Sequence, residues 1–252
     1  MAVKTAQFIV RVPFDDRHVK GLEQTPVWCR YRIKLFEEFT LRSLLNQNFR
    51  NFRIFLICGE RNREMKESHD WHPKVELCYD TGRKKYDEIE ADYVSITRVD
   101  SDDLLHRDAL TEIRDSLIFS EKRECLVFLK HWLWSVPAGL LAHRTYHDPA
   151  PPYYTHIFPR KIFKDWPEFD RQHNVGHGHA GGDLCGTKAL SPWKVCVVKH
   201  WANTGRIKRG KPLVTNRKGS NKNGNGMFKV LQDFGIQRYQ MSCDYKIEWK
   251  ET

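Results

Sequence analysis

Short hydrophobic runs alternate with longer amphipathic stretches in the first hundred residues. The runs are rich in β-branched and aromatic residues and end at glycine, proline or aspartate, which predicts strands. They lie at residues 8–14, 52–58, 74–79 and 93–99. Residues 28–46 carry a broad apolar face with helical spacing, and the charged segments 61–68 and 84–91 are typical of short helices. This alternation predicts βαβ units and a mostly parallel sheet.

The pattern after residue 100 is less regular. Residues 104–119 have helical spacing, and residues 227–234 predict a short helix. Residues 124–136 predict either one long strand or a pair, and further strands are expected at 153–163 and 193–200. Asparagine, glycine, lysine and arginine dominate residues 203–226, which predicts a long loop. We therefore expect one α/β domain over residues 1–252.

Three carboxylates follow the predicted strand at residues 93–99. Asp100, Asp102 and Asp103 lie within four positions, where their charges repel one another. A divalent cation such as Mg²⁺ or Mn²⁺ would relieve that repulsion, because both ions prefer oxygen ligands and often bind through substrate phosphates. The alternative is an aspartate-rich turn in which Ser101 or Asp103 caps the next helix.

The net charge of +10 is concentrated in one stretch. Between Asp183 and Asp233 the sequence has eleven lysines and arginines and no carboxylate, so the rest of the chain is close to neutral. Such a stretch, residues 184–232, suggests a polyanionic partner: phosphate groups, nucleic acid or an acidic membrane surface. A solvated basic face without a partner is the alternative.

Composition places the chain among soluble proteins. The sequence is 40% hydrophobic and has no apolar run long enough to span a membrane. It lacks the apolar core of a signal peptide, and its seven cysteines form no paired motif. We expect reduced thiols and a cytoplasmic protein, with peripheral membrane association as an alternative.

Three stretches resemble one enzyme family. Residues 43–57 (SLLNQNFRNFRIFLI) and the DSDD motif at residues 100–103 are similar to the family 2 glycosyltransferases of the GT-A fold. The longer phrase at residues 97–108 (TRVDSDDLLHRD) resembles the rhamnosyltransferase branch of that family. Residues 192–200 (PWKVCVVKH) are loosely similar to a late strand of the same branch.

The resemblance implies a GT-A fold, in which a twisted, mostly parallel, Rossmann-like sheet is flanked by helices. It also implies a nucleotide-diphosphate-sugar donor and a divalent cation, Mn²⁺ or Mg²⁺. On this basis residues 1–120 form the half that binds the nucleotide-sugar. Residues 121–252 form the half that binds the acceptor and carry the basic loop at 203–226.

Individual roles follow from the same resemblance. Asp102 would be the main metal ligand, with Asp100 and His200 as further ligands. Asp100 would also lie near the nucleoside ribose, and Asp103 would assist or hold the sugar. Arg11 would hold the nucleoside, and Arg98 is a further candidate for binding the donor.

Two further roles have less specific support in the sequence. The family commonly ends its second strand in an acidic phrase that contacts the base, whereas this chain has Cys58, Gly59 and Glu60, so Glu60 is the substitute candidate. Direct displacement needs a general base for the acceptor hydroxyl. Asp183, which follows two glycines, is the first candidate for this base and Asp170 the second.

We therefore expect a metal-dependent glycosyltransferase of hexosyltransferase type that inverts the anomeric centre. The acceptor would be a glycan or lipid-linked sugar that meets the basic stretch. One alternative is a glycosyltransferase that modifies a base in DNA. Others are a non-enzymatic nucleic-acid-binding protein, for which no recognition motif is present, and an inactive homologue.

Overall fold

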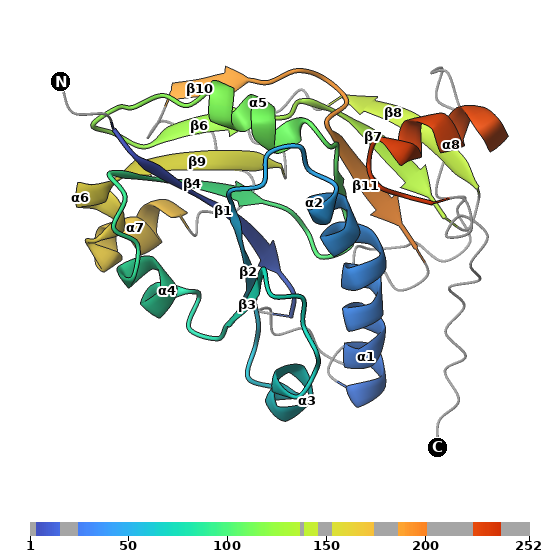
Figure 1. Cartoon of the computed structure of the whole chain (residues 1–252), viewed down its shortest axis with the longest axis horizontal. Coiled ribbons are helices and arrows are strands. Elements are labelled where there is room, and N and C mark those ends of the chain that lie inside the picture. The colour runs from blue at the N-terminus through green and yellow to red at the C-terminus, as the bar shows by residue number, and fades with distance from the viewer. Residues whose placement is uncertain are drawn as a thin grey trace.

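A seven-stranded sheet forms the centre of the molecule, in the order β10-β6-β9-β4-β1-β2-β3 (Figure 1). The computed structural model describes residues 4–15, 25–136, 139–145, 153–173, 186–200 and 224–237. The strands are β1 (Ala6–Pro13), β2 (Arg53–Ile57), β3 (Val75–Cys78), β4 (Tyr93–Arg98), β6 (Glu124–Val127), β9 (Tyr154–Pro159) and β10 (Gly186–Ala189). Strands β3, β2, β1 and β4 are parallel, whereas β9 runs antiparallel to both β4 and β6. The predicted α/β fold with a mostly parallel sheet is confirmed.

Side chains alternate between the two faces of this sheet. Val10 and Val12 of β1 join a core with helices α1 (Pro26–Leu35) and α5 (Ala109–Asp115). Ile9, on the opposite face, joins a second core with α4 (Arg83–Asp87), α6 (Arg160–Phe163) and α7 (Trp166–His173). Both faces are therefore covered, as expected for parallel strands with near-continuous apolar sequences.

The helix that follows β1 is nearly continuous over three segments. It consists of α1, a π-helical segment η2 (Phe36–Leu41) and α2 (Arg42–Leu45). The hydroxyl of Thr25 accepts a hydrogen bond from the Trp28 N–H at 3.2 Å and caps the start, and Pro26 occupies the first turn. The short helix α3 (Arg63–Glu67) follows β2.

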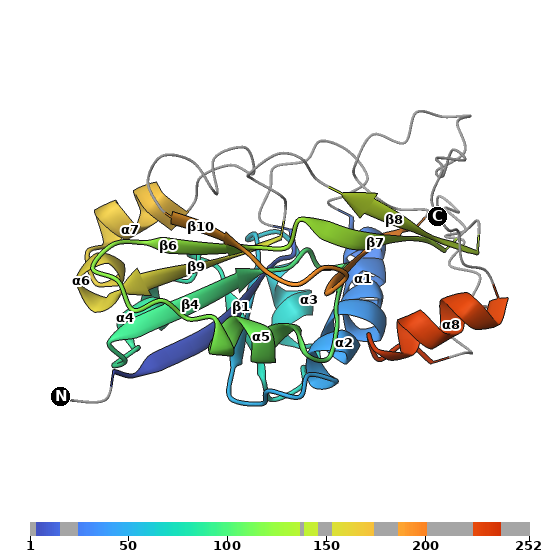
Figure 2. The ribbon, with the colours of Figure 1, turned by 90° about the horizontal axis from the view of Figure 1, so that it is seen from above.

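A second, four-stranded sheet in the order β5-β11-β7-β8 continues from the central one. It contains β5 (Leu104–Leu105), β7 (Lys130–Ser135), β8 (Leu140–Thr145) and β11 (Val195–Lys199). Helix α8 (Gly224–Gln232) packs against it through a separate hydrophobic core that includes Trp134 and Leu231. Figures 1 and 2 show this sheet and α8 at one end of the molecule, with α6 and α7 at the other.

Several predicted elements differ from the structure. The helix expected at 104–119 begins only at Ala109, because Leu104 and Leu105 pair with β11. The strand expected at 153–163 ends at Pro159 and continues as α6. The last residues of the loop expected at 203–226 belong to α8, and residues 203–223 lie outside the described part. The polar elements β8, β10 and α7 were not predicted.

Candidate functional site

The chain turns from the central sheet into the second sheet directly after β4. The Val99 N–H donates to the Arg11 carbonyl at 3.1 Å and extends the pairing of β4 with β1. The Asp103 N–H then donates to the Asp100 carbonyl at 3.0 Å, and β5 begins at the next residue. The acidic cluster therefore stands at the carboxyl edge of the central sheet, where ligands of α/β proteins commonly bind.

Asp102 and His200 meet at this edge, although 98 positions separate them in the sequence. The Nε2 atom of His200 lies 2.9 Å from Oδ2 of Asp102, and Nη1 of Arg32 donates to the same oxygen at 3.1 Å. All three residues are buried. Burial by itself would raise the pKa of Asp102, but the Arg32 charge and the His200 hydrogen bond outweigh it and hold that pKa well below its ordinary value. Asp102 is therefore ionised at neutral pH.

Helix α1 brings Arg32 to this carboxylate. Trp28 lies one turn earlier on the same helix, with its ring centroid 5.8 Å from the guanidinium carbon. The Nη2 group of Arg32 donates to the hydroxyl of Ser101, beside Asp102. One guanidinium thus holds two consecutive residues of the acidic turn.

Asp103 connects the two sheets. Its Oδ1 accepts a hydrogen bond from the Val198 N–H of β11 at 2.8 Å. Its Oδ2 accepts a hydrogen bond from the hydroxyl of Tyr153. Burial, together with the charges of Asp102 and Asp100, raises its pKa well above the ordinary value, which favours the protonated acid. Val198 lies two residues before His200, so its hydrogen bond to Asp103 helps to position the histidine.

Asp100 belongs to a different neighbourhood. Its Oδ1 lies 2.8 Å from Nη2 of Arg98, and Arg98 is the register partner of Arg11 in the parallel pair β4 and β1. Both arginines are buried. Arg11 follows Ile9 on the sheet face that α4 and α7 cover, where it influences the pKa of Tyr86. The predicted donor-binding residues Arg11, Arg98 and Asp100 therefore lie together, whereas Asp102 joins α1.

The remaining predicted residues lie elsewhere. Glu60 is exposed and pairs with Arg63 of α3 at 3.1 Å. Asp170 lies on α7, which covers the sheet face opposite α1, so the structure does not bring it to Asp102. Asp183 lies outside the described residues.

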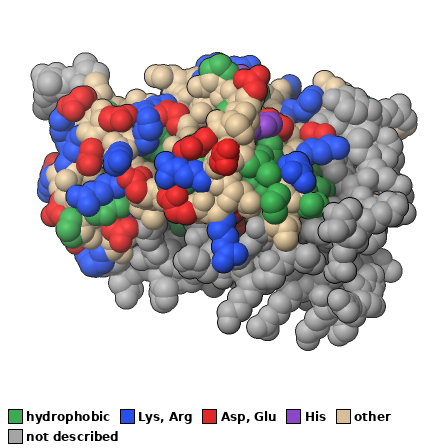
Figure 3. Space-filling model, turned by 90° about the horizontal axis from the view of Figure 1, so that it is seen from below, with side chains coloured by type: hydrophobic (Ala, Val, Ile, Leu, Met, Phe, Trp, Pro, Cys, Tyr) green, Lys and Arg blue, Asp and Glu red, His purple; other side chains and the backbone are tan. Residues whose placement is uncertain are grey.

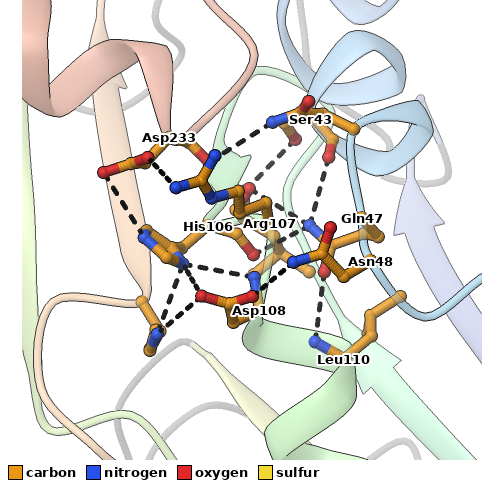
Figure 4. A network of polar contacts seen from close by, with 11 residues as sticks. Ser43, Gln47, Asn48, His106, Arg107, Asp108, Leu110 and Asp233 are labelled. Carbon is orange, nitrogen blue, oxygen red and sulfur yellow. Dashed lines mark hydrogen bonds and ion pairs between the residues drawn. The ribbon is translucent and has the colours of Figure 1, made fainter.

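A polar network fixes the segment that follows the acidic turn (Figure 4). The Gln47 amide group donates to the carbonyls of Leu105 and His106, and its oxygen accepts the Leu110 N–H at 3.1 Å. On the other side of the segment, Arg107 pairs with Asp233 at 3.0 Å. The motif at residues 43–57 and the end of α8 therefore hold this segment between them.

The chemistry of the donor set can be compared with the needs of a divalent cation. Among the described residues, no group of three or more His, Cys, Asp or Glu side chains could hold a metal ion. Asp102 Oδ2 and His200 Nε2, 2.9 Å apart, form a pair. Adjacent ligands of an octahedral Mg²⁺ at about 2.1 Å lie about 3 Å apart, and this ion usually takes one or two carboxylates and completes its shell with water and substrate phosphates. The spacing of the pair matches that of two adjacent ligands, and Nε2 becomes a ligand only when it loses the proton that it donates to Asp102.

Arg32 and Tyr153 were not predicted as site residues. Arg32 carries a usable signal, because it follows Trp28 by four positions and precedes Phe36 by four on the buried face of the helix. A buried arginine needs an acidic partner, and the cluster at residues 100–103 is a strong candidate. Tyr153 has no such signal, because it follows a proline-rich loop and reaches Asp103 only through the pairing of β9 with β4.

Comparisons with known proteins add little. No protein-family model matches the sequence, and no curated protein matches it significantly. Among solved structures, the chain is similar to residues 1–349 of TarS from S. aureus, with a TM-score of 0.42 and 14% identity over 76% of this chain and 60% of that one. It therefore spans less than two thirds of the length of that protein.

Two further solved structures show similarity of the same order. One is the inositol-1-phosphate CTP transferase of T. maritima, with a TM-score of 0.41 and 10% identity over 77% of this chain and 90% of that chain. The other is the glycosyltransferase GlyE of Streptococcus pneumoniae TIGR4, with a TM-score of 0.36 and 12% identity over 74% of this chain and 46% of that chain. These likenesses are too weak to carry an argument about activity.

Proposed function

We propose that this protein is a glycosyltransferase that uses a nucleotide-diphosphate-sugar donor and a divalent cation, Mn²⁺ or Mg²⁺. One observation carries the proposal: the buried pair of Asp102 and His200 at the carboxyl edge of the central sheet. These two residues would hold the cation. The motifs at residues 43–57 and 97–108 support the donor class by resemblance, and the network around Gln47 connects these two motifs.

The chemistry of the site suits the departure of a diphosphate. Negative charge grows on the diphosphate as the bond to the sugar breaks, and a bound cation supplies positive charge at that point. Arg32 adds a fixed positive charge beside Asp102. His200 would bind the cation through Nε2 after losing the proton that this atom now donates to Asp102, and Asp103 secures the strand that carries the histidine. These groups are in place before the substrate binds, so they need little reorganisation during the reaction.

The proposal also covers the attack of the acceptor hydroxyl on the sugar. We assign the general base to Asp183 and expect direct displacement with inversion of the anomeric centre. Asp170, the second candidate in the sequence, lies on α7 and away from Asp102, so it is not assigned this role. Residues 1–120 would bind the donor, and residues 121–252 would supply His200 and bind the acceptor. The enzymes that the motifs resemble usually transfer hexoses, so we propose that the donor carries a hexose.

The basic stretch at 184–232 is proposed to meet a polyanionic or membrane-associated acceptor, either a glycan or a lipid-linked sugar. Seven of its eleven basic residues lie within residues 201–223, outside the described part. On the face shown in Figure 3, acidic and basic side chains are interspersed over the described surface. Every described helix is too short or too polar to span a bilayer. We propose that the protein acts in the cytoplasm, with the membrane surface as one source of acceptor.

A panel of nucleotide-sugars tests the proposal. Purified protein should release free nucleoside diphosphate from at least one donor in the presence of Mn²⁺ or Mg²⁺, and EDTA should stop the release. Asp102→Asn should abolish activity, whereas Asp115→Asn, at an exposed position on α5, should leave it unchanged. Activity that persists in both EDTA and the Asp102 variant would overturn the assignment of the site.

A further inference from the structure

Arg32 has donor capacity beyond its observed contacts. Its side chain is only 8% exposed, and its two terminal groups donate to Asp102 and Ser101. The Nε atom is buried and has no hydrogen-bond partner among the residues that the structure describes. A guanidinium has five N–H groups in one plane, and a buried donor without an acceptor is unfavourable. Arg32 can therefore donate to one further acceptor through Nε.

The charges around Arg32 also favour an anion. Asp102 is shared between Arg32 and His200, so one carboxylate serves two groups that donate to it. The nearby Asp100 pairs with Arg98. A divalent cation bound at Asp102 would add further positive charge. An anionic ligand would balance the charge that such a cation adds.

Tyr31, the preceding residue of α1, provides a second donor beside the pair. Its ring centroid lies 6.1 Å from that of His200, in an edge-on arrangement. Its hydroxyl is buried and has no hydrogen-bond partner within the described part of the chain. Two consecutive residues of α1 thus present donors next to Asp102 and His200.

We infer that Arg32 and Tyr31 bind the diphosphate of the donor directly, an inference that rests on the proposed function. Arginine suits this role because its planar fork matches two phosphate oxygens, and charge-assisted hydrogen bonds are the stronger class. Arg32 would also keep Asp102 oriented while the cation binds. Helix α1 would thus form one wall of the donor site.

Binding measurements on Arg32→Gln and Tyr31→Phe test this inference, with Arg30→Gln as the matched control on the exposed face of the same helix. The diphosphates UDP, GDP, CDP and dTDP are titrated in parallel with their nucleosides, with Mn²⁺ and with EDTA. For the diphosphate that wild type binds, Arg32→Gln should weaken affinity about ten- to hundredfold and Tyr31→Phe about threefold to tenfold. Affinity for the nucleoside should not change in either variant.

A second comparison separates direct contact from loss of Asp102 orientation. In EDTA and in an Asp102→Asn background, where the cation and the carboxylate charge are both removed, Arg32→Gln should still weaken diphosphate binding. Unchanged diphosphate affinity in Arg32→Gln would overturn the inference and leave the proposed function standing. Absence of diphosphate binding by wild type would overturn both. If Arg32→Gln does not fold, Tyr31→Phe, which removes a single oxygen, decides the inference by the same criterion.

Discussion

The Nζ atom of Lys66 lies 2.7 Å from Oδ2 of Asp15, and the lysine side chain is completely buried. The same ammonium donates to the Gly59 carbonyl at 2.6 Å, and the other oxygen of Asp15 accepts the Gly59 N–H at 2.7 Å. The pair thus ties the end of β1 to the end of β2.

Lys66→Met should destabilise the protein by about 3–5 kcal/mol, because it leaves a nearly buried carboxylate without its partner. Lys34→Met is the matched control: Lys34 pairs with Glu38 at 3.9 Å, and its side chain is 61% exposed. That change should cost about 0.5 kcal/mol or less. Urea unfolding of both variants measures the difference, and equal costs would show that the Asp15 junction contributes little.

His200→Gln should reduce the affinity for Mn²⁺ in the presence of nucleoside diphosphate by at least about tenfold, because the proposed cation loses one of its two protein ligands. Electron paramagnetic resonance of free Mn²⁺ measures the affinity directly. His143→Gln, at an exposed position on β8, should bind Mn²⁺ as wild type does. Equal affinities in the two variants would argue that His200 only orients Asp102.

Asp103 should tolerate one substitution and not another. Asp103→Asn retains an acceptor for the Val198 N–H and resembles the protonated acid that the site favours, so it should cost about 1 kcal/mol or less. Asp103→Ala leaves both the Val198 N–H and the Tyr153 hydroxyl without their partner and should cost about 2–4 kcal/mol. Denaturant unfolding at pH 7 distinguishes them, and a large cost for the asparagine variant would mean that Asp103 is ionised.

Acid should destabilise the fold partly through His131. Burial, followed by the charges of Arg144 and Lys199, lowers its pKa to about 3, whereas an unfolded histidine has a pKa of about 6.5. Between these two pH values, His131 is therefore protonated in the unfolded chain and neutral in the folded chain. The contribution of His131 to the free energy of unfolding is complete above about pH 6.5. It falls by up to about 1.4 kcal/mol per pH unit as the pH drops towards 3.

Replacement of this histidine tests the acid effect. His131→Phe should flatten the dependence of unfolding free energy on pH between about 6 and 4, even if it changes the absolute stability. His143→Gln, on the paired strand β8, should leave the slope unchanged because that side chain is exposed. Equal slopes in wild type and His131→Phe would show that the residue takes up its proton in the folded state too.

The sequence alone determined the elements that depend on local pattern. Apolar runs with β-branched residues identified β1, β2, β3 and β4, because strands buried on both faces have nearly continuous apolar sequences. Helical spacing identified the helix at 26–45, because one face of that helix is buried. The sequence also located the acidic cluster at a strand end, where the structure has it. Elements such as β8 and α7 leave a weaker signal, since β8 is the edge strand of its sheet and α7 has only eight residues.

Tertiary structure decided the composition of the site. Leu104 and Leu105 have helical spacing, but they pair with β11, and that pairing brings His200 to Asp102. The contact between Arg32 and Asp102 spans 70 positions and depends on how α1 packs against the sheet. Local pattern cannot specify such contacts, because they arise only when separate elements bury their apolar faces together. What Asp102 and His200 bind stays a prediction, whereas their meeting follows from the packing of the two sheets.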